Sequence, residues 1–124
     1  PIRCTSELNP RINEQQEGNM FIARWIIDVR FGRKDDFIKR IQQWYEEVGE
    51  KVGLTKNHLR VNTGSIGAME SRFEFDHSVE SLEALQTMWD MMVKLDSHTK
   101  FGLDLEPLIV PGSSHWEIFR TVDL

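Results

Sequence analysis

Hydrophobic and polar residues alternate along four stretches of the chain, which is the pattern of strands with one face on a core. It predicts strands at about Met20–Phe31, His58–Thr63, Glu70–His77 and Ser114–Val122. The second and third are separated by Gly64–Gly67, a segment with the composition of a hairpin turn. These two strands should therefore pair with each other.

Two stretches carry apolar residues at helical spacing. The first follows Gly32 and presents Phe37, Ile41, Trp44, Tyr45 and Val48 on one side. The second should begin after Ser78, which we predict to be its N-cap. Its apolar side is wide and comprises Leu82, Leu85, Met88, Trp89, Met91, Met92 and Leu95. The segment from Lys100 to Pro111 is predicted to be a compact connector with one short helical turn.

The predicted order is β-α-β-β-α-β, the ferredoxin-like arrangement of the α+β class. In this fold a four-stranded antiparallel sheet carries both helices on one face. The chain has 124 residues, which suits a single domain. We assign residues 20–124 to that domain and interpret residues 1–19, which have few apolar side chains, as an N-terminal arm or a disordered tail.

The two faces of the predicted sheet differ in composition. The helix-facing set is almost entirely apolar: Trp25, Ile27, Val29, Leu59, Val61, Phe73, Phe75, Trp116, Ile118 and Val122. The opposite set is rich in charges, such as Arg24, Arg72 and Glu74, but Ile22, Ile26 and Phe119 interrupt it. This face is either solvated or covered by a second copy of the chain. We favour a homodimer through the sheet face, because these apolar side chains would otherwise be bare.

The net charge of −5 argues against a nucleic-acid or anionic-membrane partner. No apolar run has the length of a membrane span, so we expect a cytoplasmic protein. The single cysteine, Cys4, excludes an internal disulfide and a CxxC motif.

None of the histidines has metal-ligand spacing, so no metal site is predicted. His77 is interpreted as marking the start of the second helix, while His58 and His115 are placed on the outer sheet face. Trp89, Met88 and Met92 have two interpretations: they fill the core, or they line a cavity that accepts a ligand.

Several segments together resemble the dimeric α+β barrel superfamily. They are the Phe-Glu-Phe run at 73–75, the helix with Leu85 and Trp89, the run from Asp96 to Phe101, and the closing segment Leu105–Val122. This superfamily includes antibiotic-biosynthesis monooxygenase-like proteins, NIPSNAP-like proteins and haem-degrading monooxygenases.

The resemblance implies a homodimer with a pocket between the sheet and the helices of each protomer. The residues around a hydrophobic small molecule would be Trp25, Val61, Phe73, Trp89, Met92, His98 and Trp116. In the monooxygenase-like branch an aromatic substrate reacts with oxygen without metal or flavin, and His98 is the candidate catalytic base. A non-catalytic binding or assembly module would use the same pocket. The other interpretation of His98 is that it lies at the C-terminus of the second predicted helix and has a purely structural role.

The haem-degrading branch implies a further alternative. It carries a helix tryptophan followed nine or ten residues later by an iron-ligating histidine, and Trp89 and His98 are nine apart. The asparagine that this branch carries early in its first strand is missing, because Trp25, Ile26 and Ile27 occupy that region. We therefore expect no cofactor, with haem as the alternative.

Overall fold

The computed structural model describes residues 20–54 and 58–124, so the predicted arm, with Cys4, lies outside the described residues. Four strands form one sheet: β1 (Phe21–Asp28), β2 (Leu59–Thr63), β3 (Arg72–Val79) and β4 (His115–Arg120). Their order is β2-β3-β1-β4, and every neighbouring pair is antiparallel. The predicted ferredoxin-like sheet is confirmed.

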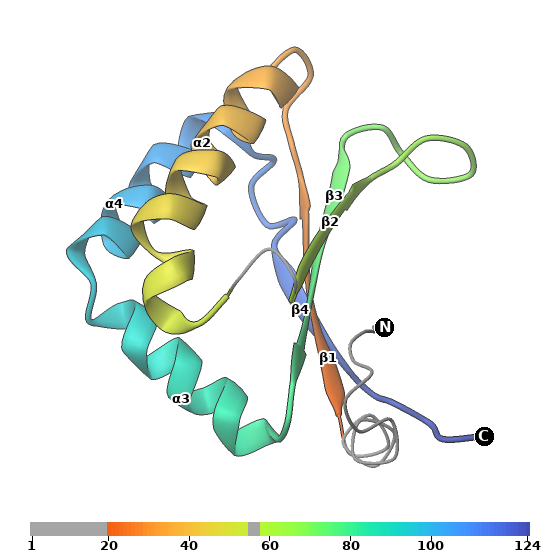
Figure 1. Cartoon of the computed structure of the whole chain (residues 1–124). Coiled ribbons are helices and arrows are strands. Elements are labelled where there is room, and N and C mark those ends of the chain that lie inside the picture. The colour runs from red at the N-terminus through yellow and green to blue at the C-terminus, as the bar shows by residue number, and fades with distance from the viewer. Residues whose placement is uncertain (1–19, 55–57) are drawn as a thin grey trace.

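The helices are α2 (Lys34–Glu47), α3 (Leu82–Val93) and α4 (Asp96–Leu105), with short 3₁₀ turns at Gly49–Val52 and Glu106–Leu108. Figure 1 shows that these three helices lie on one side of the sheet, and that no helix of the described residues covers the other side. No helix within the described ranges is long and apolar enough to cross a membrane.

Helix α4 replaces the first part of the connector that the sequence predicted at Lys100–Pro111, and the predicted short helical turn before Pro111 is the 3₁₀ turn Glu106–Leu108. Helix α4 begins at Asp96, directly after α3, and turns the inward side chains of Phe101 and Leu105 into the core, where each is 5% exposed. Its composition conceals it, because Asp96, Ser97, Thr99 and Gly102 are weak helix formers. Tertiary packing of the buried pair supplies what propensity does not. His98 consequently lies in the first turn of α4 and not at a helix C-terminus.

The N-cap of α3 is Ser81, not the predicted Ser78. The Ser81 Oγ accepts a hydrogen bond from the Ala84 backbone N–H at 3.0 Å, while Ser78 is still paired in β3. Strand β3 continues to Val79 because that side chain is buried with Ala23 and Leu85. His77 is therefore a strand residue, and its interpretation as the start of the helix is wrong.

The largest part of the core lies beneath α2. Phe37, which is completely buried, packs on Phe73 and Phe75 with ring centroids 4.8 and 6.1 Å apart. Ile27 from β1 and Val29, which directly follows β1, belong to the same cluster. The first turn of α2 is thereby fixed against β3, and the rest of the helix extends over the sheet towards Trp44 (Figure 1).

Replacing Ser81 with Ala should lower the free energy of unfolding by about 0.5–2 kcal/mol, because one N-terminal N–H of α3 loses its acceptor. Ser78→Ala is the matched control, since Ser78 lies in β3 and caps no helix. Urea denaturation of both variants measures the difference. An equal loss in the two variants would contradict the observed cap.

Candidate functional site

A cavity of about 550 Å³ lies between the sheet and the three helices. Its sheet side is formed by Trp25, Leu59, Phe75, His77 and Trp116. The helix side and its flanks comprise Ile41, Trp44, Leu54, Trp89, Met92, Val93, His98, Phe101, Gly102 and Leu105. We call this site the aromatic cavity. None of these described lining residues is Asp, Glu, Lys or Arg, so its polar atoms come from histidine, indole and backbone groups.

The cavity follows from the sheet register and from the size of the side chains. Trp25 lies opposite Phe75 on one side and opposite Trp116 on the other, so three rings stand in a row on the helix-facing surface. Trp25 is 5.1 Å from Phe75 and 6.4 Å from Trp116 between ring centroids. Such large, rigid rings hold the helices away from the backbone of the sheet, and the space between them stays open.

Helices α2 and α4 meet at a hydrogen bond between two cavity residues. The Trp44 Nε1–H donates to His98 Nδ1 at 3.1 Å, and both rings contact Phe101. Because an indole N–H can only donate, His98 Nδ1 must be the acceptor and the proton of the neutral imidazole is on Nε2. Burial lowers the pKa of His98, which favours this neutral form.

His77 is the second cavity histidine, and its side chain is buried with 4% exposure. Its ring stands perpendicular to Trp116 at 6.1 Å between centroids. Burial lowers the pKa of His77, and the neighbouring Asp76 carboxylate opposes this shift more weakly. His77 therefore enters the cavity as a neutral imidazole at pH 7.

Two buried polar atoms of the cavity have no hydrogen-bond partner among the described residues. They are His77 Nε2 and the Nε1 of Trp89. Trp89 packs edge-on against Trp116 at 5.1 Å, so both unpartnered atoms belong to rings that contact the same indole. By contrast, the Trp25 N–H donates to Ser114 Oγ at 2.7 Å, and the Trp44 N–H is bonded to His98.

The structure brings together five of the seven residues that were predicted to surround a pocket: Trp25, Trp89, Met92, His98 and Trp116. Phe73 does not line the cavity, because Phe37 covers it. Val61 lies on edge strand β2 with its side chain 45% exposed, outside the cavity lining. Substrate binding by the five, and catalysis by His98, stay predictions.

Sequence reasoning missed Trp44, Phe101 and His77 as cavity residues. Trp44 had a usable signal, because it belongs to the apolar stripe of the first helix, but nothing indicated that this stripe faces a cavity. Phe101 was missed with α4 itself. His77 lies on the helix-facing surface in the alternation of β3, yet its position near a predicted helix start concealed its role.

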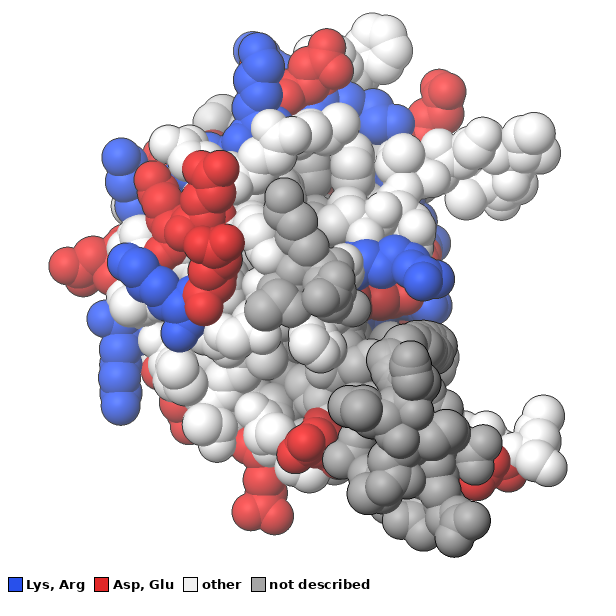
Figure 2. Space-filling model, viewed as in Figure 1, with Lys and Arg blue, Asp and Glu red and all other residues white. Residues whose placement is uncertain are grey.

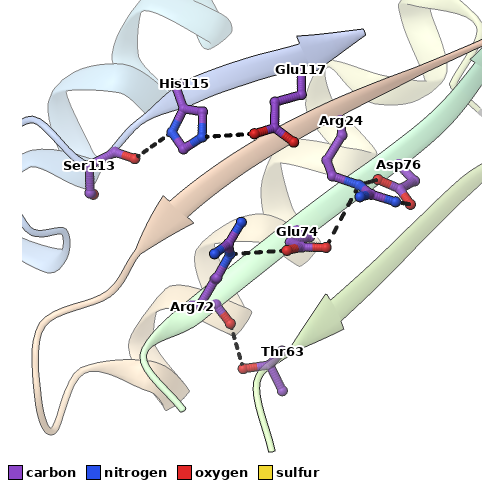
Figure 3. Close-up of polar contacts among 8 residues, drawn as sticks. All are labelled: Arg24, Thr63, Arg72, Glu74, Asp76, Ser113, His115 and Glu117. Carbon is purple, nitrogen blue, oxygen red and sulfur yellow. Dashed lines mark hydrogen bonds and ion pairs between the residues drawn. The ribbon is translucent and has the colours of Figure 1, made fainter. Parts of the chain in front are cut away.

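The outer sheet face carries an ordered set of ion pairs within one chain (Figure 3). The Arg24 guanidinium donates to both carboxylate oxygens of Asp76, at 2.8 and 3.0 Å, and lies 3.7 Å from Glu74. Arg72 is paired with Glu74 at 3.0 Å. Arg24 also lies over the Phe119 ring, 4.9 Å from its centroid. These charges are therefore matched within a single chain, and Phe119 is 44% exposed beside them.

The lining of the aromatic cavity does not fit haem. His98 Nε2 could face an iron, but no described lining residue is a Lys or Arg that would pair with the two propionates. Within the described part of the chain, no group of three or more His, Cys, Asp and Glu side chains is placed to hold a metal ion.

Solved structures share this fold. A NIPSNAP family protein from Agrobacterium tumefaciens strain C58 is 18% identical, with a TM-score of 0.72 over 86% of this chain and 89% of its own. A NIPSNAP-like domain protein from Burkholderia xenovorans is 16% identical, with a TM-score of 0.60 over 82% of this chain and 84% of its own. The resemblance stated from the sequence is confirmed at the level of the fold.

A third similar structure comes from Caulobacter crescentus CB15 and is assigned to the antibiotic biosynthesis monooxygenases. It is 15% identical, with a TM-score of 0.63 over 90% of this chain and 97% of its own. No protein-family model matches the sequence, and no curated protein matches it. At these identities the likeness establishes a common fold and leaves the activity to the site.

Because the pKa values of the two cavity histidines are lowered, we predict that the stability of the protein depends on pH. Their pKa values are lowered from 6.5 in the folded state, so on acidification the unfolded chain takes up protons first. Their contribution is complete above 6.5 and is lost as the pH falls through the lowered folded values. The free energy of unfolding should therefore fall from about pH 7 to about pH 5, and His77→Phe should reduce that fall. Denaturant titrations at several pH values across this range measure the free energy of unfolding. If it depends on pH identically in His77→Phe and in the wild type, the prediction is wrong.

Proposed function

We propose that the protein binds a small, uncharged, largely aromatic molecule in the aromatic cavity. The observation that supports this most is the combination of volume and lining: about 550 Å³ bounded by four tryptophans, two phenylalanines and no charged side chain among the described residues. Cavities that accept small ligands typically measure about 300–1,000 Å³ and have apolar walls with few polar groups. A charged ligand would lose its hydration there without gaining a counter-charge.

Gly102 gives a direct way to test occupancy of the cavity. It lies in α4 and belongs to the lining, and a Cβ added there meets no heavy atom within 4 Å. Gly102→Leu should fill part of the cavity, and it replaces a poor helix former with a good one. Gly102→Ala gives at least the same gain in helix propensity and adds only one methyl group, so it is the matched control.

We expect Prodan, an uncharged naphthalene dye whose emission shifts to the blue in apolar surroundings, to bind the wild type and Gly102→Ala. Gly102→Leu should weaken binding by about 10-fold or more, because side-chain atoms occupy the ligand's space. A fluorescence titration measures this. Equal affinity for Gly102→Leu and Gly102→Ala, or no blue shift with the wild type, would contradict binding in the cavity.

The second candidate function is turnover of the bound molecule as a cofactor-independent monooxygenase. It is favoured by the state of His98, which the Trp44 bond leaves with its proton on Nε2. Neutral His98 is therefore suited to donate a hydrogen bond to an oxyanion that develops on a deprotonated substrate, and less to the role of base that the sequence suggested. The substrate would lose its proton to solvent, one oxygen atom of O2 would enter the substrate and the other would leave as water, and the substrate would supply both the electrons and the two hydrogens of that water.

Oxygen uptake distinguishes this candidate from the non-catalytic binding module. We expect two- and three-ring hydroxyaromatics to consume oxygen faster with protein than without it, and His98→Phe to remove most of the difference. Trp44→Phe should have a smaller effect, because it frees Nδ1 but keeps the imidazole. No uptake above the protein-free rate for compounds that bind would favour the binding module.

We also propose that two copies pair through their outer sheet faces. Phe119 and the partly exposed ion-pair network of Arg24 offer an apolar centre surrounded by matched charges, as protein interfaces often do. A homodimer would cover Phe119, and the charges of one copy would face those of the other.

A further inference from the structure

We propose that His77 and Trp89 form a hydroxyl-binding subsite within the aromatic cavity, so that the preferred ligand is a hydroxyaromatic compound. This inference rests on the proposed function, because it specifies which molecule the cavity selects. It adds His77, a residue that the sequence did not assign to a site.

The first step in the argument is that these two atoms are unpartnered. His77 Nε2 and Trp89 Nε1 are buried, and no described residue offers either a hydrogen bond. Leaving a buried donor or acceptor without a partner is costly, so native proteins satisfy nearly all such groups. Both residues line the aromatic cavity, where a ligand can supply the missing bonds.

The second step is that the rings that carry the two atoms lie in one region of the cavity. The rings of His77 and Trp89 each contact Trp116, at 6.1 and 5.1 Å between centroids, and each stands edge-on to it. Figure 1 shows the elements that carry them, with β3 leading directly into the turn before α3. A single polar group beside Trp116 is therefore the simplest partner for both.

The third step is the chemistry of the pair. An indole N–H only donates. In the proposed subsite the neutral His77 carries its proton on Nδ1, so that its Nε2 accepts. A hydroxyl group is both donor and acceptor, so it can donate to His77 Nε2 and accept from Trp89 Nε1 at the same time. An ether oxygen can only accept, and it would leave His77 Nε2 without a bond. A carboxylate would bring a full charge into a cavity with no charged described lining residue to compensate it.

Two other tryptophans of the cavity explain why the subsite is at Trp89. The Trp25 N–H is bonded to Ser114 Oγ at 2.7 Å, and the Trp44 N–H is bonded to His98 Nδ1 at 3.1 Å. Their donors are already used within the protein, so they present only ring surface to a ligand. Trp25→Phe is therefore a matched control for Trp89→Phe: each removes one indole N–H from the same cavity.

The test compares 1-naphthol, 1-methoxynaphthalene and naphthalene by isothermal titration calorimetry. We expect the wild type to bind 1-naphthol about 3-fold more tightly than 1-methoxynaphthalene, whose ether oxygen still accepts from Trp89, and about 10-fold more tightly than naphthalene, which makes neither of the two net hydrogen bonds. His77→Phe and Trp89→Phe should each reduce the preference over naphthalene to about 3-fold or less. Trp25→Phe should keep the preference, even if all three affinities change together.

The outcomes separate the subsite from the proposed function. If all three compounds bind the wild type with equal affinity, the subsite is refuted while binding in the cavity stands. If 1-naphthol is preferred but Trp25→Phe removes the preference as fully as Trp89→Phe, the subsite is also refuted. If none of the three compounds binds at millimolar concentration, the proposed function itself fails. The comparison of the three compounds on the wild type tests the subsite even if His77→Phe does not fold.

Discussion

The hydrogen bond between Trp44 and His98 is the interaction on which the site depends. It joins α2 to α4 on the side of the cavity opposite the sheet, at a point where the helices contribute mainly rings. A net contribution of about 0.5–1.5 kcal/mol is typical for such a bond, so its main effect is on geometry and not on overall stability. Because the indole can only donate, the bond also decides where the imidazole of His98 carries its proton.

The second feature of the site is that its cavity has no charged side chain among the described lining residues. The charged side chains are placed elsewhere: Figure 2 shows Lys, Arg, Asp and Glu mostly around the rim of this view, with uncharged surface across much of its middle. On the outer sheet face, Arg24 and Asp76 pair with each other. Inside the cavity, burial keeps His77 and His98 neutral by lowering their pKa values. One face of the sheet therefore carries ion pairs, and the other face borders the uncharged aromatic cavity.

The sequence was sufficient for the strands and the fold class, since the alternation in β1 and β3 shows which face of each strand is buried. It was also sufficient for Trp25, Trp89 and Trp116 as cavity residues. It failed where tertiary contacts outweigh local preference. Helix α4 forms because Phe101 and Leu105 are buried, although Gly102 and its polar neighbours disfavour a helix. Phe73 and Phe75 are equivalent in the strand pattern and both pack against Phe37, but only Phe75 also lines the cavity.

The state of the two imidazoles is the most direct test of this account. Long-range ¹H–¹⁵N NMR spectra of the histidine rings report which nitrogen carries the proton. At pH 7 we predict that His98 is neutral with its proton on Nε2, that Trp44→Phe abolishes this preference, and that His77 is neutral as well. A His98 protonated on Nδ1, or either ring carrying both protons at that pH, would contradict the Trp44–His98 bond and the uncharged cavity built around it.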